Sequence, residues 1–197
     1  MRARGGLGLQ GKPCFRDLIG RKTLINGDVR AGKTKLTAEL LEEAVEQGHS
    51  EEITVIDMAP EAEVYEGRSI GGRLPELTDA CSRVRYLSPP KVETPRLRAK
   101  TPGELLHMAR LNEERIKALL DEYLERPSPI LFVNDVSIFL QSGSIDPVLL
   151  AANRAGTFVA NGYYGEQLSA DLGTGVSERE RALMDALASE MDLIISL

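Results

Sequence analysis

Residues 27–34 carry a pattern whose residue types and spacing suggest a specific chemistry. They read Gly-Asp-Val-Arg-Ala-Gly-Lys-Thr and match G-x-x-x-x-G-K-[ST] at every fixed position. In such a loop, backbone N–H groups surround phosphate oxygens, the lysine reaches the terminal phosphate, and the threonine hydroxyl reaches Mg²⁺. We therefore expect a nucleoside triphosphate, with ATP preferred, and Mg²⁺ to bind here. The alternative is a glycine-containing turn before an ordinary helix.

A carboxylate for the metal ion is expected at the end of an apolar run. Asp135 follows the run at 130–134, which reads Ile-Leu-Phe-Val-Asn. An acid in this place lies at the carboxyl edge of a parallel sheet, where open α/β folds bind ligands. We expect Thr34 and Asp135 to hold Mg²⁺. The alternative role for Asp135 is to cap the N-terminus of a helix.

Further acids follow a second apolar run. Asp57 ends the run at 53–57, and Glu61 and Glu63 come shortly after it. Any of the three could activate an attacking water if its strand lies near the phosphates. We take Lys33, Asp57 and Glu61 as the candidate catalytic residues. Solvated surface positions are the alternative for the two glutamates.

A polar residue also ends the run at 157–160. Asn161 could sense the terminal phosphate, although the sequence Asn161-Gly162 is equally typical of a turn. Within the glycine-rich loop, Asp28 and Arg30 either pair with each other or point to solvent. The residues expected to bind the nucleotide are Gly27, Asp28, Val29, Arg30, Ala31, Gly32, Lys33, Thr34, Lys35 and Asn161.

Short β-rich runs alternate with helical patterns along the chain. The runs lie at 23–26, 53–57, 84–87, 130–134, 157–160 and 192–196. Helices are expected from Thr101 to Arg126, from Asp146 to about Gly156, and from a capping box at 177–180. This alternation predicts an α/β fold with a mostly parallel sheet. We expect an N-terminal arm at 1–19 and one domain at 20–197.

The order of these motifs resembles the RecA-like branch of P-loop NTPases. The matching segments are 27–34, 53–63, 84–126, 130–135 and 157–161, within a resemblance that spans 23–197. It implies a three-layer P-loop NTPase fold with a RecA-like central sheet, and an ATPase. A weaker resemblance links the chain to ATP-dependent corrinoid adenosyltransferases. The chain departs from these enzymes in its loop residues 28–31 and in having Val136 after Asp135.

Two arginine-bearing segments add hypotheses about function. Residues 67–73 contain three glycines, Arg68 and Arg73, so a mobile loop with an arginine finger is one interpretation. Residues 83–100 form a basic stretch for which nucleic acid, a phosphate-bearing substrate or an acidic partner are hypotheses. Solvated arginines are the favoured interpretation of both segments.

Composition excludes several classes of protein. The chain has 197 residues, 42% of them hydrophobic, and a net charge of −6, which argues against disorder and against nonspecific nucleic-acid binding. Cys14, Cys81, His49 and His107 lack the spacing of a zinc site. We expect a cytoplasmic protein with no membrane partner. A nucleoside triphosphate is the expected ligand, and a second small-molecule substrate, a protein partner and a homo-oligomer stay open.

The expected function is therefore Mg²⁺-dependent ATP binding with ATP hydrolysis. Two alternatives remain. The first is ATP-dependent transfer to a small molecule by an adenosyltransferase or kinase. The second is a nucleotide-gated binding module without turnover.

Overall fold

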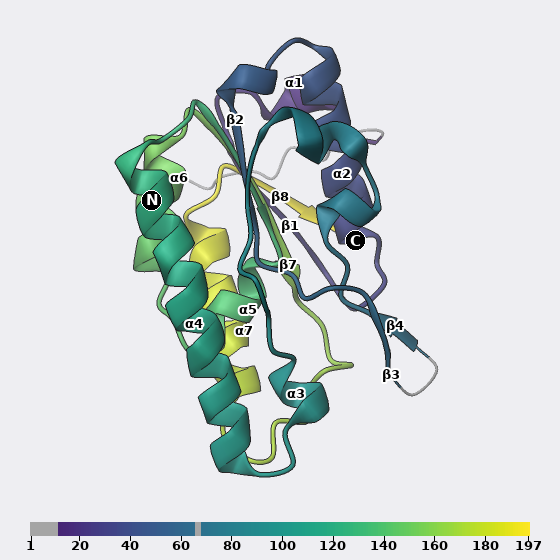
Figure 1. The fold of residues 1–197 in the computed structure, drawn as a ribbon, viewed down its shortest axis with the longest axis vertical. Helices are drawn as coiled ribbons and strands as arrows, with labels where there is room; N and C mark the ends of the chain where they lie inside the picture. The colour runs from purple at the N-terminus through teal and green to yellow at the C-terminus, as the bar shows by residue number, and fades with distance from the viewer. Residues whose placement is uncertain (1–11, 66–67) are drawn as a thin grey trace.

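A parallel sheet forms the centre of the molecule (Figure 1). The computed structural model describes residues 12–65 and 68–197. Six strands lie in the order β5-β2-β6-β7-β1-β8, and every neighbouring pair is parallel. Their bounds are β1 (Lys22–Gly27), β2 (Ile53–Asp57), β5 (Arg85–Leu87), β6 (Ile130–Asn134), β7 (Thr157–Tyr163) and β8 (Leu193–Ser196). The mostly parallel α/β sheet predicted from the apolar runs is confirmed.

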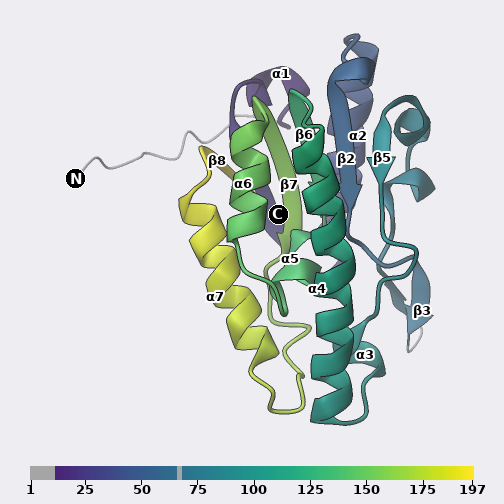
Figure 2. The same cartoon turned by 60° about the vertical axis from the view of Figure 1, so that its left-hand side comes forward.

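Helices cover both faces of this sheet and make three layers (Figure 2). One face carries α4 (Pro102–Glu125), α5 (Val136–Leu140), α6 (Asp146–Arg154) and α7 (Val176–Ser189). The other carries α1 (Phe15–Leu18), α2 (Lys33–Glu46) and the 3₁₀ helices Leu74–Glu76 and Asp79–Arg83. A further 3₁₀ turn, Ser50–Glu52, precedes β2, and the short helix α3 (Pro95–Arg98) precedes α4.

Successive residues of the central strands enter different cores. In β6, Ile130 and Phe132 pack with the α2 side, whereas Leu131 and Val133 pack with the α4 side. Because side chains alternate between the faces of a strand, a strand covered on both faces needs apolar residues at every position. This requirement explains the uninterrupted apolar run.

Helix boundaries follow local hydrogen bonds. Thr101 caps α4 as expected, because its hydroxyl accepts a hydrogen bond from the Glu104 N–H at 3.2 Å. The helix expected from residue 177 begins one residue earlier, at Val176. Asp171 takes the capping role there, since its carboxylate accepts from the Ser177 N–H at 3.0 Å. Glu180 is consequently not used as a capping residue.

Three other segments differ from, or add to, the sequence expectations. Strand β7 runs through Asn161 to Tyr163, so the alternative of a turn at 161–162 is wrong. The glycine-rich segment near 67–73, expected as a loop, contains β4 (Arg68–Ile70), which pairs antiparallel with β3 (Glu63–Tyr65). Gly67 itself lies outside the described residues. In the segment assigned to an N-terminal arm, residues 12–19 contain α1, and its Phe15 and Leu18 are fully buried. Among the described residues, no helix combines the length and apolarity needed to cross a membrane.

Candidate functional site

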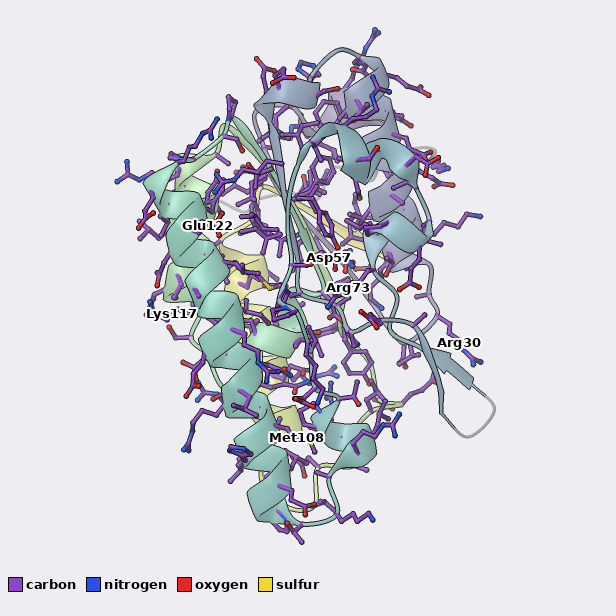
Figure 3. All side chains as sticks on the ribbon, in the orientation of Figure 1. Arg30, Asp57, Arg73, Met108, Lys117 and Glu122 are labelled. Atoms are coloured by element: carbon purple, nitrogen blue, oxygen red, sulfur yellow. The ribbon has the colours of Figure 1, made fainter. Side chains whose placement is uncertain are left out.

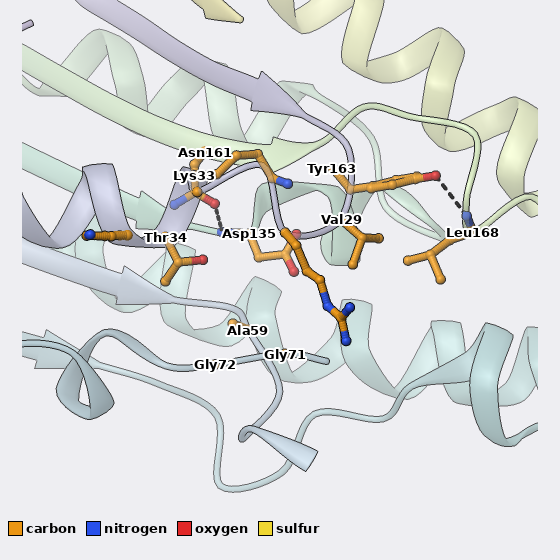
Figure 4. A pocket seen from close by; sticks show the side chains of 13 residues that line it. Val29, Lys33, Thr34, Ala59, Gly71, Gly72, Asp135, Asn161, Tyr163 and Leu168 are labelled. Atoms are coloured by element: carbon orange, nitrogen blue, oxygen red, sulfur yellow. Dashed lines mark hydrogen bonds between the residues drawn. The ribbon is translucent and has the colours of Figure 1, made fainter. Parts of the chain in front are cut away.

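A cavity of about 320 Å³ lies at the carboxyl edge of the sheet (Figure 4). Most of its lining residues lie at or just after the ends of β1, β2, β6 and β7, four strands that all end at this edge. Its lining residues are Val29, Arg30, Gly32, Lys33, Thr34, Lys35, Ala59, Gly71, Gly72, Asp135, Asn161, Tyr163 and Leu168. The structure therefore brings Lys33, Thr34, Asp135 and Asn161 together around one space.

The β1–α2 loop, residues 27–32, needs its glycines for two different reasons. A Cβ atom on Gly27 would lie 2.7 Å from the carbonyl oxygen of Leu197, so no larger residue fits there. Gly32 has φ +96° just before α2 begins, in the left-handed region that favours glycine. Arg30 has φ +64° without being glycine, and its side chain points outward from the loop (Figure 3).

Lys33 lies at the start of α2 and turns back over the loop. Its Nζ donates a hydrogen bond to the Asp28 carbonyl oxygen at 2.7 Å. Burial lowers the pKa of Lys33, and the carboxylates of Asp135 and Asp28 oppose that shift. The cation is thus held in a partly buried place at the edge of the cavity.

The Asp28 carboxylate makes hydrogen bonds with backbone N–H groups and does not pair with Arg30. The carboxylate accepts hydrogen bonds from the N–H of Val29 at 2.6 Å and of Glu166 at 3.3 Å. A Cβ atom on Gly165 would lie 2.3 Å from the Asp28 Cγ, so glycine leaves the room that this carboxylate occupies. Gly27, Asp28 and Ala31 shape the loop and do not line the cavity.

Asp135 follows β6 and has φ +58°. Its N–H donates to the Asn161 Oδ1 at 3.0 Å, and its Oδ1 accepts from the Ser137 hydroxyl at 2.6 Å. Burial raises the pKa of Asp135, while the Ser137 hydrogen bond and the cations Lys33 and Arg96 act in the opposite direction. Asp135 precedes α5, but its side chain makes no capping hydrogen bond.

A buried polar network connects the cavity wall to the neighbouring strands. The Asn161 Nδ2 donates to the Thr37 hydroxyl and to the Asn134 Oδ1, both at 2.8 Å. Asn134 in turn donates to the Asp57 Oδ1 at 2.8 Å and to the Gly72 carbonyl oxygen at 3.3 Å. The network therefore fixes Asn161 and Gly72, which both line the cavity.

Asp57 belongs to this network and does not line the cavity. Besides Asn134, its donors are the N–H groups of Ala59 and Leu74 and the Tyr86 hydroxyl, at 3.2, 2.7 and 3.0 Å. Asp57 is fully buried, and this burial raises its pKa. The carboxylate thus holds the segments on either side of the hairpin in place.

The remaining candidates lie away from the cavity. Glu61 is exposed and lines a separate cavity of about 460 Å³ together with Arg73. The Arg73 guanidinium donates to the carbonyl oxygens of Ala59 and Pro89, at 3.3 and 2.9 Å. The side chains of Glu63 and Arg68 lie outside the described part of the structure.

The basic stretch at 83–100 is divided between different environments. Arg83 and Lys100 are exposed. Arg85 pairs with Glu122 at 3.0 Å, and Lys91 pairs with Glu93 at 2.9 Å. Arg96 differs from the expected solvated arginines, because its side chain is only 6% exposed.

Several lining residues have no signal in the sequence. Ala59, Tyr163 and Leu168 belong to no recognisable motif, whereas Gly71 and Gly72 belong to the glycine-rich segment at 67–73 that the sequence singled out. Knowing that β7 continues to Tyr163 would have indicated Tyr163 and Leu168, since Tyr163 is the last residue of this strand and Leu168 follows it.

The donor set at the cavity limits which metal could bind. Within the described ranges, no group of three or more His, Cys, Asp or Glu side chains could hold a metal ion. The cavity instead offers the Thr34 hydroxyl and the Asp135 carboxylate. Such a set suits a hard cation that takes its remaining oxygens from a ligand or water.

No protein-family model matches the chain, and a comparison with curated proteins finds no match either.

Proposed function

We propose that this protein binds a Mg²⁺–nucleoside triphosphate, with ATP preferred, in the cavity at the carboxyl edge of the sheet. The observation that carries the proposal is the convergence of Lys33 and Thr34 with Asp135 on one cavity. The loop pattern and the acid are about 100 residues apart in the chain, so sequence spacing alone does not require them to meet.

The cavity suits a polyanion for two reasons. The first N–H groups of α2 lack intrahelical acceptors, and the 14-residue helix directs its positive end toward the loop. The Lys33 Nζ needs only to exchange the Asp28 carbonyl oxygen for a phosphate oxygen. Phosphate contacts would thus replace a hydrogen bond that the loop already makes.

Thr34 and Asp135 are the residues proposed to hold Mg²⁺. The oxygen donors present fit this ion, which is commonly held by one or two carboxylates plus phosphates and water. When bound, Mg²⁺ would neutralise charge on the β- and γ-phosphates. The Asn161 Oδ1 accepts a hydrogen bond from the Asp135 N–H. Asn161 would therefore position the Asp135 carboxylate for this role.

Slow hydrolysis is the expected activity of the isolated protein. Asp57 is committed to its hydrogen-bond network, and Glu61 lies in a different cavity. Of the described carboxylates, only Asp135 lines the proposed site. Water would therefore lack a second carboxylate to activate it, and neither Asp57 nor Glu61 is retained in the proposal as a base.

The sheet order also supports membership of the RecA-like branch of P-loop NTPases. Strand β7 lies between β1 and β6, so Asn161 stands between the loop and Asp135. In the RecA-like branch, the strand that follows the metal-binding acid along the chain ends in a polar residue that senses the terminal phosphate, and Asn161 is the residue proposed for this role.

The test is calorimetric titration of the protein with Mg²⁺–ATP. We expect binding in the wild type and a loss of about 10- to 100-fold in Lys33→Ala, because a charge-assisted hydrogen bond is removed. Lys117→Ala is the matched control, since Lys117 lies on the outer side of α4 (Figure 3). Absence of Mg²⁺–ATP binding, or equal affinities in both variants, would overturn the proposal.

Phosphoryl transfer to a small molecule is a second candidate function. It is favoured by a second cavity that adjoins the first, because the two share Tyr163 and Leu168 as lining residues. Product analysis with labelled ATP separates the cases: labelled acceptor indicates transfer, free phosphate indicates hydrolysis, and intact ATP indicates a binding module.

A further inference from the structure

The adjoining cavity has a volume of about 500 Å³, within the range of small-molecule sites. It lies between the segment that follows β7 and the first turns of α7. Tyr164, Glu166, Ser177, Glu180 and Arg181 are among its lining residues. Because Tyr163 and Leu168 also line it, a molecule here would be a neighbour of a ligand in the first cavity.

If the proposed function holds, the lysine that contacts the phosphates is connected to the wall of this second cavity. The Lys33 Nζ, which would contact the β- and γ-phosphates, donates a hydrogen bond to the Asp28 carbonyl oxygen. The Asp28 carboxylate in turn accepts a hydrogen bond from the N–H of Glu166, a lining residue of the second cavity. Asp28 therefore links the lysine that would bind the phosphates to the segment that lines the second cavity.

The second cavity contains a buried ion pair. Arg96 and Glu180 meet at 3.0 Å, with side chains that are 6% and 2% exposed. Arg96 also donates to the Leu168 carbonyl oxygen at 3.0 Å, and Gln141 donates to Glu180 at 2.9 Å. Both hydrogen bonds to Glu180 end on Oε2. The Oε1 atom is thus left as an acceptor for a ligand hydroxyl.

Aromatic rings and charge indicate what kind of ligand fits. The Arg181 guanidinium lies over the Tyr164 ring, 4.4 Å from its centroid. The Arg96 guanidinium lies over the Tyr163 ring, 5.2 Å from its centroid. Such rings also stack on planar heterocycles. Three carboxylates and two guanidinium groups line the cavity, which leaves one net negative charge and disfavours a phosphorylated ligand.

We propose that the second cavity binds a nucleoside, whose hydroxyl accepts the γ-phosphoryl group of the triphosphate. The planar base stacks on the tyrosines, and a sugar hydroxyl donates to the Glu180 Oε1. The hydroxyl oxygen forms a bond to the γ-phosphorus while the bond to the β,γ-bridging oxygen breaks. The nucleoside diphosphate leaves with that electron pair, and the hydroxyl proton passes to Glu180.

The state of Glu180 agrees with this role. Burial raises the pKa of Glu180 to about 7, although Arg96 and Gln141 favour its charged form. A carboxylate of this kind can take up a proton near neutral pH.

Binding is tested first. The protein is saturated with Mg²⁺ and a nonhydrolysable ATP analogue, and adenosine, guanosine, cytidine and uridine are each titrated by calorimetry. We expect at least one to bind, with a loss of about tenfold or more in Ser169→Trp, which fills the cavity. Ala170→Trp is the control, because Ala170 is exposed and does not line the cavity.

The outcomes separate the two proposals. Failure of the ATP analogue to bind overturns the proposed function and the transfer step with it. Binding of the analogue without binding of any nucleoside, or equal affinities in the two tryptophan variants, overturns only the nucleoside site.

Transfer is tested with ATP labelled in the γ-phosphate and the nucleoside that binds. We expect a labelled nucleoside monophosphate, with a rate lowered about 10²-fold or more in Glu180→Gln. The affinity for the ATP analogue should stay unchanged in this variant, which shows that the first cavity is intact. Glu190→Gln, at the exposed end of α7, is the control. Transfer at the wild-type rate in Glu180→Gln would refute the role of Glu180.

Discussion

Glu180 should make the stability of this protein depend on pH near neutrality. In the folded protein, burial and the nearby Asp135 carboxylate raise its pKa from 4.5 to about 7 against the opposing effects of Arg96 and Gln141. A carboxyl group with a raised folded pKa contributes stability that is complete below its unfolded pKa. That stability is lost as the pH rises through the folded pKa.

The expected magnitude follows from the difference between the two pKa values. One pKa unit corresponds to about 1.4 kcal/mol, so the contribution of Glu180 falls by about 3 kcal/mol between about pH 4.5 and pH 8. Glu180→Gln removes this titration. Asp57 and Asp135 also have raised pKa values, and subtracting the variant's curve from the wild-type curve isolates Glu180.

The assay is urea denaturation at intervals of pH across this range. The free energy of unfolding of the wild type, relative to Glu180→Gln, should decline as the pH rises. Glu190→Gln should follow the wild-type curve, because Glu190 is exposed. Parallel curves for the wild type and Glu180→Gln would refute the assignment of a raised pKa, whatever the constant offset between them.

Three further predictions concern the first cavity. Asn134→Ala should lower the free energy of unfolding by about 2–4 kcal/mol in urea denaturation, because buried groups of Asp57 and Asn161 lose a partner. The exposed Asn153→Ala should change it by less than about 0.5 kcal/mol, and equal effects would contradict the network. Asp135→Asn should fold normally, because asparagine also tolerates φ +58°. In calorimetric titrations, the ATP affinity of this variant should no longer depend on Mg²⁺. An unchanged dependence on Mg²⁺ would exclude Asp135 as a ligand. In Gly165→Ala, the new Cβ displaces the Asp28 carboxylate, and a weaker Mg²⁺–ATP affinity is expected; unchanged affinity would show that this carboxylate does not shape the loop.

The strands were predictable because their burial requires consecutive apolar residues, a pattern that is visible in the local sequence. A strand covered on both faces, such as β6, must be apolar at successive positions, and a polar residue then appears where the strand leaves the core. That rule placed Asp135 correctly at the sheet edge. It also placed Asp57 there, but nothing local distinguishes a carboxylate that faces a cavity from one that accepts four buried hydrogen bonds.

The second cavity could not be predicted because its contacts are long-range. Arg96 and Glu180 are 84 positions apart, and each had a plausible local role, one in a basic stretch and one in a capping box. Asn161-Gly162 misled for a related reason. A turn dipeptide can continue a strand when tertiary hydrogen bonds hold it, and Asn161 is held by Thr37 and Asn134.

The position of β1 in the sheet has a consequence for biosynthesis. Its two neighbours, β7 and β8, are the last strands of the described chain. While the ribosome extends the polypeptide, β1 has no partner until residues 157–163 emerge, although β2, β5 and β6 can already associate. The glycine-rich loop therefore acquires its rigid support only after β7 has been synthesised, and nascent chains that stall before β7 leave β1 as an unpaired strand.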